Sequence, residues 1–207
     1  MIFQGAEALP LALVGLDKDL LDTVGSRIVA IFDPRANGEI CGVPVIGGDD
    51  AWPAYKVSHP SVKPLIAIDL PRLRRKLSAH YGAEDCATFI AADAKVSRHA
   101  IIGTGVVIQR GVYVSADVEL ADAVRINVGA QIHHDCRLSS FVTVAPGALL
   151  MGSVRVGRDA YIGAGAVVRQ GLTIGEGAVV GAGAVVTRPV AAGVTVVGAP
   201  AKPIARA

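Results

Sequence analysis

The chain has 207 residues, which is enough for one large domain or two small ones with a buried core. Its formal net charge is +2, with 18% charged and 4% aromatic residues, so it lacks the basic stripe with interleaved aromatic rings that a nucleic-acid groove needs. No stretch approaches the roughly 18 uncharged apolar residues that span a bilayer. We therefore expect no nucleic-acid partner and no membrane span.

Two further features concern the compartment. Residues 1–15 are apolar but carry Glu7 and no basic segment, so we do not expect a secretory signal. The three cysteines, Cys41, Cys86 and Cys136, form no CxxC pair and give an odd total, which speaks against a disulfide framework or a zinc knuckle. These observations together favour a reducing, cytoplasmic environment.

The first 88 residues predict a small α/β domain. The apolar runs 9–15, 27–33 and 63–69 are typical of strands and alternate with polar segments, and residues 71–85 open with proline and predict a basic helix. In a Rossmann-like βαβ unit of this kind, ligands bind at the carboxyl ends of the strands, where Gly15 and Asp33 stand. Because an acid at the end of the second strand often contacts a ribose, we expect a sugar nucleotide to bind here.

Residues 89–207 form the second expected domain, which contains a six-residue repeat. From residue 90 an aliphatic side chain returns every six positions, seventeen times without a miss, and a small apolar residue follows four positions after each one. Two apolar positions per hexad suit a short strand, and the glycines and polar residues between them suit tight corners. The spacing predicts a β-solenoid, for which the usual crossover preference favours a right hand. The seventeen positions are Ile90, Val96, Ile102, Ile108, Val114, Leu120, Ile126, Ile132, Leu138, Val144, Leu150, Val156, Ile162, Val168, Ile174, Val180 and Val186.

This repeat resembles the parallel β-helix of hexapeptide-repeat acyltransferases, in which three hexads close one triangular coil. The resemblance implies a left-handed coil of 18 residues, opposite to the usual crossover hand. Residues 18 apart would then stack about 4.8 Å from one another.

The segment "INVGAQIHHDCRL", residues 126–138, carries the polar residues of most interest. Counting from Ile132, His133 is an outward neighbour of the strand, whereas His134 and Asp135 fall at a corner. Gly152 lies 18 residues beyond His134, so the stacking places it at the same corner one coil along. An imidazole, a carboxylate and an unshielded peptide N–H are the parts of an acyl-transfer site.

Other interpretations of this corner stay open. The polar residues can simply be solvated, which suits His133 better than His134. A metal site is a third interpretation, because γ-class carbonic anhydrases share this β-helix and bind zinc through an "HxxxxHxC" pattern. Here Gly129 stands at the first ligand position, so we expect no metal.

The motif "N-x6-H-D-C", followed by "FVTVAPGALLMGSVRVG", narrows the resemblance. Together with "IFDP", "GVPVIG", "AIDLPRLRRKL" and "VGAPAKP", it is similar to the sialic acid O-acetyltransferase and bacillosamine N-acetyltransferase family, which acetylates sugars and sugar nucleotides with acetyl-CoA. The resemblance implies a homotrimer with acetyl-CoA between adjacent β-helices. It implies these roles: His134 as general base, Asp135 as the acid that orients it, Asn127 as a sugar contact, Gly152 as the amide facing the thioester carbonyl, and Arg188 and Lys202 as neighbours of the CoA phosphates.

Two departures from the family pattern affect the ligands. Thr143 stands where many members have a second histidine, nine residues after the base. The usual "GGHG"-like turn after the first strand is replaced by "VGLDKDLLD", in which only Gly15 is kept and the acids Asp17 and Asp19 repel a diphosphate. The nucleotide is then anchored from elsewhere, with Arg35, Arg72 and Arg74 as candidates, unless these are surface arginines.

The sequence thus predicts an acetyl-CoA-dependent N-acetyltransferase that acts on the amino group of a nucleotide-linked amino sugar. We expect direct attack of the amine, because Cys136 occupies an inward position where a thiol is an apolar filler rather than a nucleophile. Two alternatives remain: O-acetylation of a free sugar such as a sialic acid, and a non-catalytic β-helix that serves as a binding module.

Overall fold

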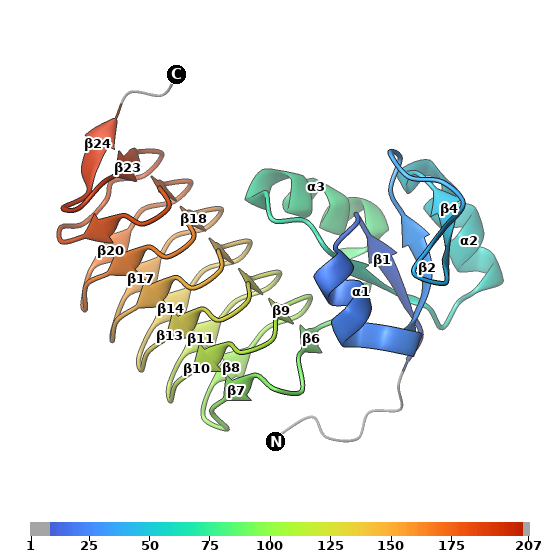
Figure 1. The fold of residues 1–207 in the computed structure, drawn as a ribbon, viewed down its shortest axis with the longest axis horizontal. Coiled ribbons are helices and arrows are strands. Elements are labelled where there is room, and N and C mark those ends of the chain that lie inside the picture. The colour runs from blue at the N-terminus through green and yellow to red at the C-terminus, as the bar shows by residue number, and fades with distance from the viewer. Residues whose placement is uncertain (1–8, 205–207) are drawn as a thin grey trace.

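The computed structural model describes residues 9–204. Residues 1–8 and 205–207 lie outside the described part, and so does most of the apolar segment 1–15 for which no secretory signal was expected. An α/β domain is followed by a parallel β-helix, and the domain lies beside the amino-terminal and middle coils of that helix (Figure 1). Within residues 9–204, no helix combines the length and the apolar character needed to cross a membrane.

The α/β domain contains a five-stranded sheet in the order β3-β4-β2-β1-β5. Four of the strands are parallel, and β3 pairs antiparallel with β4 at the edge. The three predicted strands and the basic helix are confirmed, whereas β3, β4 and α2 were not predicted. The elements are β1 Leu11–Val14, α1 Lys18–Val24, β2 Ile28–Phe32, β3 Glu39–Ile40, β4 Val43–Gly47, α2 Trp52–Ser58, β5 Lys63–Ile66 and α3 Pro71–Tyr81.

The order in which successive strands join the sheet reverses at β1. Strand β2 lies on one side of β1 and β5 on the other, so the carboxyl ends of β1 and β5 border the crevice where ligands of such sheets bind. Asp17 follows β1 and Asp69 follows β5. Both side chains bond to Arg125 of the β-helix, so this edge of the sheet faces the helix.

The β-helix consists of seventeen two-residue strands, β6 to β22, which stack into three faces. Each pairing joins residues 18 apart, as in Val114, Ile132 and Leu150, and this confirms the predicted length of the coil. The first face contains β7, β10, β13, β16, β19 and β22; the second contains β8, β11, β14, β17 and β20; the third contains β6, β9, β12, β15, β18 and β21, followed by β23 and β24. The strands are β6 Phe89–Ile90, β7 Lys95–Val96, β8 Ile101–Ile102, β9 Val107–Ile108, β10 Tyr113–Val114, β11 Glu119–Leu120, β12 Arg125–Ile126, β13 Gln131–Ile132, β14 Arg137–Leu138, β15 Thr143–Val144, β16 Leu149–Leu150, β17 Arg155–Val156, β18 Tyr161–Ile162, β19 Val167–Val168, β20 Thr173–Ile174, β21 Val179–Val180 and β22 Val185–Val186.

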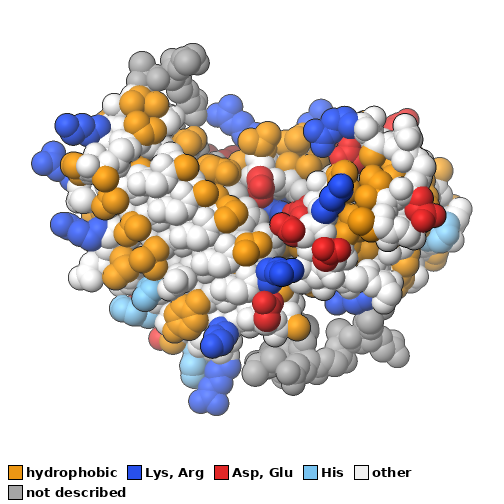
Figure 2. Space-filling model, viewed as in Figure 1, with side chains coloured by type: hydrophobic (Ala, Val, Ile, Leu, Met, Phe, Trp, Pro, Cys, Tyr) orange, Lys and Arg blue, Asp and Glu red, His pale blue; other side chains and the backbone are white. Residues whose placement is uncertain are grey.

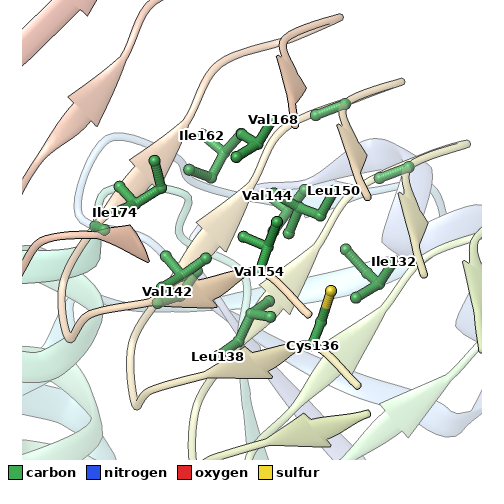
Figure 3. Close-up of a cluster of buried hydrophobic side chains, with 14 of the residues drawn as sticks. Ile132, Cys136, Leu138, Val142, Val144, Leu150, Val154, Ile162, Val168 and Ile174 are labelled. Carbon is green, nitrogen blue, oxygen red and sulfur yellow. The ribbon is translucent and has the colours of Figure 1, made fainter. Parts of the chain in front are cut away.

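The interior of the β-helix is filled by the aliphatic side chains of the repeat, which are almost completely buried from Ile108 onward (Figure 3). Cys136 points into this interior and is 0% exposed, as its inward position predicted. The first hexad departs from the pattern, because Ile90 is 37% exposed at the end of the prism. The coil also shortens at the carboxyl end, where β23 Thr195–Val197 pairs with β21. The chain then turns back, and β24 Lys202–Ile204 pairs antiparallel with β23.

Arg74 of α3 joins the two domains. Its side chain is 1% exposed, and its five N–H donors meet five backbone carbonyls. Burial lowers the pKa of Arg74 to about 9, so the guanidinium keeps its charge at neutral pH. The expectation that Arg74 anchors a nucleotide is therefore wrong, because it has no donor left for a ligand. The acceptors are Ile68 and Asp69 after β5 and, at the same corner of two successive coils of the β-helix, Ala123, Phe141 and Val142.

Candidate active site

His134 and Asp135 lie at the corner between β13 and β14, where the chain passes from the first face to the second. Asp135 has a φ of 60°, a left-handed conformation that aspartate tolerates better than most residues. His134 Nδ1 lies 2.7 Å from Asp135 Oδ2. Because an ionised carboxylate only accepts, Nδ1 donates to it and Nε2 keeps its lone pair. The pair has the form of an oriented general base.

Gly152 lies directly against the ring of His134. A Cβ at residue 152 would stand 2.6 Å from His134 Cε1 and 2.7 Å from Nε2, which is closer than real side chains approach. The predicted stacking of these two residues is confirmed. Among the described residues, the N–H of Gly152 has no hydrogen-bond acceptor, whereas its neighbour Ser153 donates to the carbonyl of His134. The free N–H and the basic nitrogen thus share one corner.

The corner is open to solvent within a single chain. The side chains of His134 and Asp135 are 62% and 56% exposed. The ring of His133 does not take part in the pair of His134 and Asp135. It lies edge-on to the ring of Tyr113, with 6.2 Å between the centroids. A base in bulk water is a weak catalyst compared with one in a dry site, so this corner needs a covering surface to work efficiently.

The corner of His134 continues along the prism as a ridge. Strands β13, β16, β19 and β22 stack in register, so His134, Gly152, Gln170 and Arg188 occupy equivalent positions in successive coils. Three coils separate His134 from Arg188, which corresponds to about 14 Å. Arg188 is exposed there. Lys202 lies on a different edge, next to the start of β22, because its neighbour Ala201 donates to Val185 O.

The residues expected to hold a nucleotide lie at the predicted strand ends but are already engaged. Gly15 has a φ of 82° and packs so closely on Ile68 that a Cβ would stand 2.4 Å from Cδ1. Asp33 is 2% exposed, and both its oxygens accept hydrogen bonds, from Arg35 and from the peptide N–H of Leu16. The side-chain bonds from Arg35 hold the pKa of Asp33 below its ordinary value. A ribose would have to displace Arg35 to reach this carboxylate.

A buried polar network fills the space between the β1–β5 edge and the third face of the β-helix. Arg125, 2% exposed, donates to Asp17 through Nη2 and to Asp69 through Nε at 2.6 Å. Gln109 also donates to Asp17. Charged side chains of both signs gather along this boundary on the face shown in Figure 2.

Asn127 belongs to the same network. It is only 3% exposed, donates to Asp69 Oδ1 at 3.0 Å, and accepts from Arg125 Nε. Asn127 follows β12, so it lies at the corner between the third and first faces, one corner away from His134. Asp69 covers it from solvent. The expected direct contact of Asn127 with a sugar does not fit this geometry, because the exposed polar group at this place is the carboxylate of Asp69.

Two remaining expectations concern Thr143 and Arg72. Thr143, which replaces the family's second histidine, is 0% exposed and donates from Oγ1 to Asp69 O at 2.6 Å. Arg72 is exposed on α3 and, with Arg75, lines a cavity of about 560 Å³ against the β-helix. Within residues 9–204 no three His, Cys, Asp or Glu side chains converge as metal ligands.

Comparisons with known proteins cover almost the whole chain. The acetyltransferase domain of PglB from Neisseria gonorrhoeae, in complex with acetyl coenzyme A, is 35% identical over 94% of this chain and 98% of its own, with a TM-score of 0.87. A mutant of GDP-perosamine N-acetyltransferase from Caulobacter crescentus, in complex with CoA and GDP-perosamine, is 33% identical over 95% and 97%, with a TM-score of 0.88. The chain belongs to the hexapeptide-repeat sugar acetyltransferases.

Further matches agree with this membership of the hexapeptide-repeat sugar acetyltransferases. WeeI from Acinetobacter baumannii is 28% identical over 94% of this chain and 99% of its own, with a TM-score of 0.85. The family model for the bacterial transferase hexapeptide (six repeats) matches residues 153–188. No curated protein matches the sequence. The fold is the left-handed β-helix of this family, as the resemblance implied and contrary to the usual crossover preference.

The sequence did not reveal that Asp69, Arg125 and Gln109 join in one network in this hexapeptide-repeat acetyltransferase. One signal was available. On the third face, the outward positions beside Arg125 are Val107 and Thr143, so a lone cation breaks an otherwise uncharged column. A buried charge needs partners, and the stacking rule alone indicates that they come from outside the β-helix.

Proposed function

We propose that this enzyme transfers the acetyl group of acetyl-CoA to the amino group of a nucleotide-linked amino sugar, with His134 as general base. The observation that carries the proposal is the corner where Asp135 holds His134 Nδ1 and the ring lies against Gly152 with its unpaired N–H. The relatives support the two substrates: the structure of the PglB domain is a complex with acetyl coenzyme A, and that of the Caulobacter enzyme is a complex with CoA and GDP-perosamine.

In the proposed reaction, the amine nitrogen attacks the thioester carbonyl carbon and forms the new C–N bond. The amine proton passes to His134 Nε2, Asp135 stabilises the resulting imidazolium, and the N–H of Gly152 donates to the oxyanion. Collapse of the intermediate breaks the C–S bond, and the imidazolium returns the proton to the departing CoA thiolate. Proton transfer to a placed base contributes about 100- to 10,000-fold in rate.

The attack is direct in this scheme because the thiol nearest to the corner is not available as a nucleophile. Cys136, the next residue after Asp135, is buried and donates to Met151 O at 3.1 Å. Burial raises the pKa of the Cys136 thiol to about 11, so it stays protonated at neutral pH. A protonated thiol in the core cannot accept an acetyl group from CoA.

A homotrimer is part of the proposal, because the exposed pair His134 and Asp135 needs a surface that excludes water. A neighbouring β-helix would cover the ridge, and acetyl-CoA would lie between the two prisms. Its pantetheine arm would follow the ridge from Gly152 toward Arg188, whose charge suits a phosphate. Lys202 would approach the phosphates only from the neighbouring edge. The oligomeric state can be measured by light scattering, and a monomer that retains full activity contradicts this part.

The test offers acetyl-CoA with a panel of UDP-, dTDP- and GDP-linked amino sugars and with free sialic acid, and measures the release of the CoA thiol. We expect turnover with at least one of the nucleotide-linked sugars and a fall in kcat of at least about a hundredfold for His134→Ala and His134→Asn. His133→Ala is the matched control and keeps its activity. Activity unchanged in both His134 variants would overturn the general-base role, and turnover with free sialic acid alone would favour O-acetylation.

A further inference from the structure

Asp69 is held more firmly than a surface carboxylate normally is. Its carbonyl accepts from Arg74 Nη1 at 3.1 Å and from Thr143 Oγ1 at 2.6 Å. Its side-chain Oδ1 accepts from Arg125 Nε at 2.6 Å and from Asn127 Nδ2 at 3.0 Å. Four donors, three of them from the β-helix, thus fix both the backbone and one oxygen of Asp69.

The second side-chain oxygen of Asp69, Oδ2, is free to accept a hydrogen bond from a ligand. Among the described residues, Oδ2 has no hydrogen-bond donor, and the side chain is 51% exposed. The donors behind it, Arg125 and Asn127, are 2% and 3% exposed, so a ligand that approaches this place from solvent meets Asp69 first. A fixed carboxylate with one free oxygen is a preorganised acceptor, which costs little ordering when a ligand donor binds.

The charge at this edge selects the kind of ligand group. Two of the N–H groups that a phosphate could use at the β1 turn are already engaged: Asp33 accepts from Leu16, and Asp17 accepts from Leu20. Asp17 therefore occupies the place of an anion at the start of α1, and Asp69 adds a second carboxylate beside it. A diphosphate is disfavoured here, whereas a hydroxyl or an ammonium group is a suitable donor to Oδ2.

We propose that Asp69 is a specificity-determining residue that binds the acceptor sugar through a hydroxyl group, because the amino group must reach His134 at another corner; Asn127 and Arg125 are positioning residues behind it. This inference rests on the proposed function, since it assumes an amino sugar as acceptor. It places the sugar, rather than the diphosphate, at the carboxyl ends of β1 and β5. Tyr161, half-buried and stacked on Thr143 in the third face, lies one coil farther along the same surface.

The test is Asp69→Asn, which keeps the size of the side chain and an oxygen for Arg125 but removes the charge. We expect the KM for the amino-sugar acceptor to rise at least about tenfold, while the KM for acetyl-CoA stays within about twofold and kcat within about threefold. Asp85→Asn is the matched control, because Asp85 has a similar side-chain exposure of 50% and pairs with Lys56 of α2 instead. Its kinetic constants should not change.

A structural role alone would give a different pattern. If Asp69→Asn raises both KM values together, or changes neither, the proposal is wrong. Acceptors that keep the amine but lack one hydroxyl each provide a second measurement: one of them should show equal KM values with both proteins. If all of them remain tenfold apart, no single contact to Asp69 exists.

The two proposals fail in distinguishable ways. Loss of the general-base role appears as full activity in His134→Ala, whatever Asp69→Asn does. If the wild-type enzyme acetylates no amino sugar of the panel, the proposed function fails, and calorimetry with the same sugars then decides on Asp69. Equal affinities of wild type and Asp69→Asn in that titration would overturn the inference.

Discussion

Gly152→Ala tests the geometry of the corner most directly. The new methyl group would stand 2.6 Å from Cε1 of His134, whereas an ordinary carbon contact is about 3.5 Å, so the ring must retreat by about 1 Å. The backbone does not resist the change, because Gly152 is not among the residues with positive φ. His134 has room to move, since its side chain is 62% exposed. The substitution should therefore displace the base without disturbing the core.

The expected cost follows from that displacement. Misplacing a catalytic group by about 1 Å lowers the rate by about a hundredfold, so kcat should fall by that factor even though the peptide N–H of residue 152 remains. Initial rates of CoA release measure the effect, and the melting temperature should change little. Gly48→Ala is the control, because its Cβ would meet the carboxylate of Asp50 at 3.0 Å and otherwise only Pro34, at 3.4 Å or more. A kcat for Gly152→Ala within about threefold of wild type would refute the proposed contact between the ring and the reacting atoms.

Two further predictions concern stability and the nucleophile. Arg74→Met should lower the free energy of unfolding by at least about 3 kcal/mol, because five buried or partly buried carbonyls lose their donor. Urea denaturation measures this, with the exposed Arg72→Met as a control within about 0.5 kcal/mol; a loss below about 1 kcal/mol for Arg74→Met contradicts the clamp. Cys136→Ala should keep kcat within about twofold while it loses about 1 kcal/mol of stability by removing a buried sulfur. A hundredfold fall in kcat with a stable fold would instead point to an acyl-enzyme.

The β-helix could be predicted because its signal is local and repeated. Each hexad carries its own inward residues, and one stacking rule then relates His134 to Gly152 without any knowledge of the rest of the chain. The hand of the coil could not be derived in this way, since the apolar spacing is the same for either hand. It came from the resemblance alone.

The junction of the two domains could not be predicted for a physical reason. Arg74 bonds to carbonyls of Ala123 and Phe141, which lie 49 and 67 residues away, and no periodicity connects these positions. Asn127 had the sequence context of a sugar contact, yet Asp69 covers it. Burial of a polar side chain depends on what a distant segment places in front of it, and β3, β4 and α2 were missed for lack of a clear alternation.

The stacked coils fix how the distance between His134 and Arg188 along the ridge can change. Because each coil contributes one equivalent position, the span from His134 to Arg188 changes only in whole steps of about 4.8 Å. Insertion or loss of 18 residues between Gly152 and Arg188 would lengthen or shorten this span by one step and leave the contact of His134 with Gly152 intact. With acetyl-CoA along the ridge, as proposed, the distance between the acetyl group and the phosphate contact would therefore be set by the number of coils.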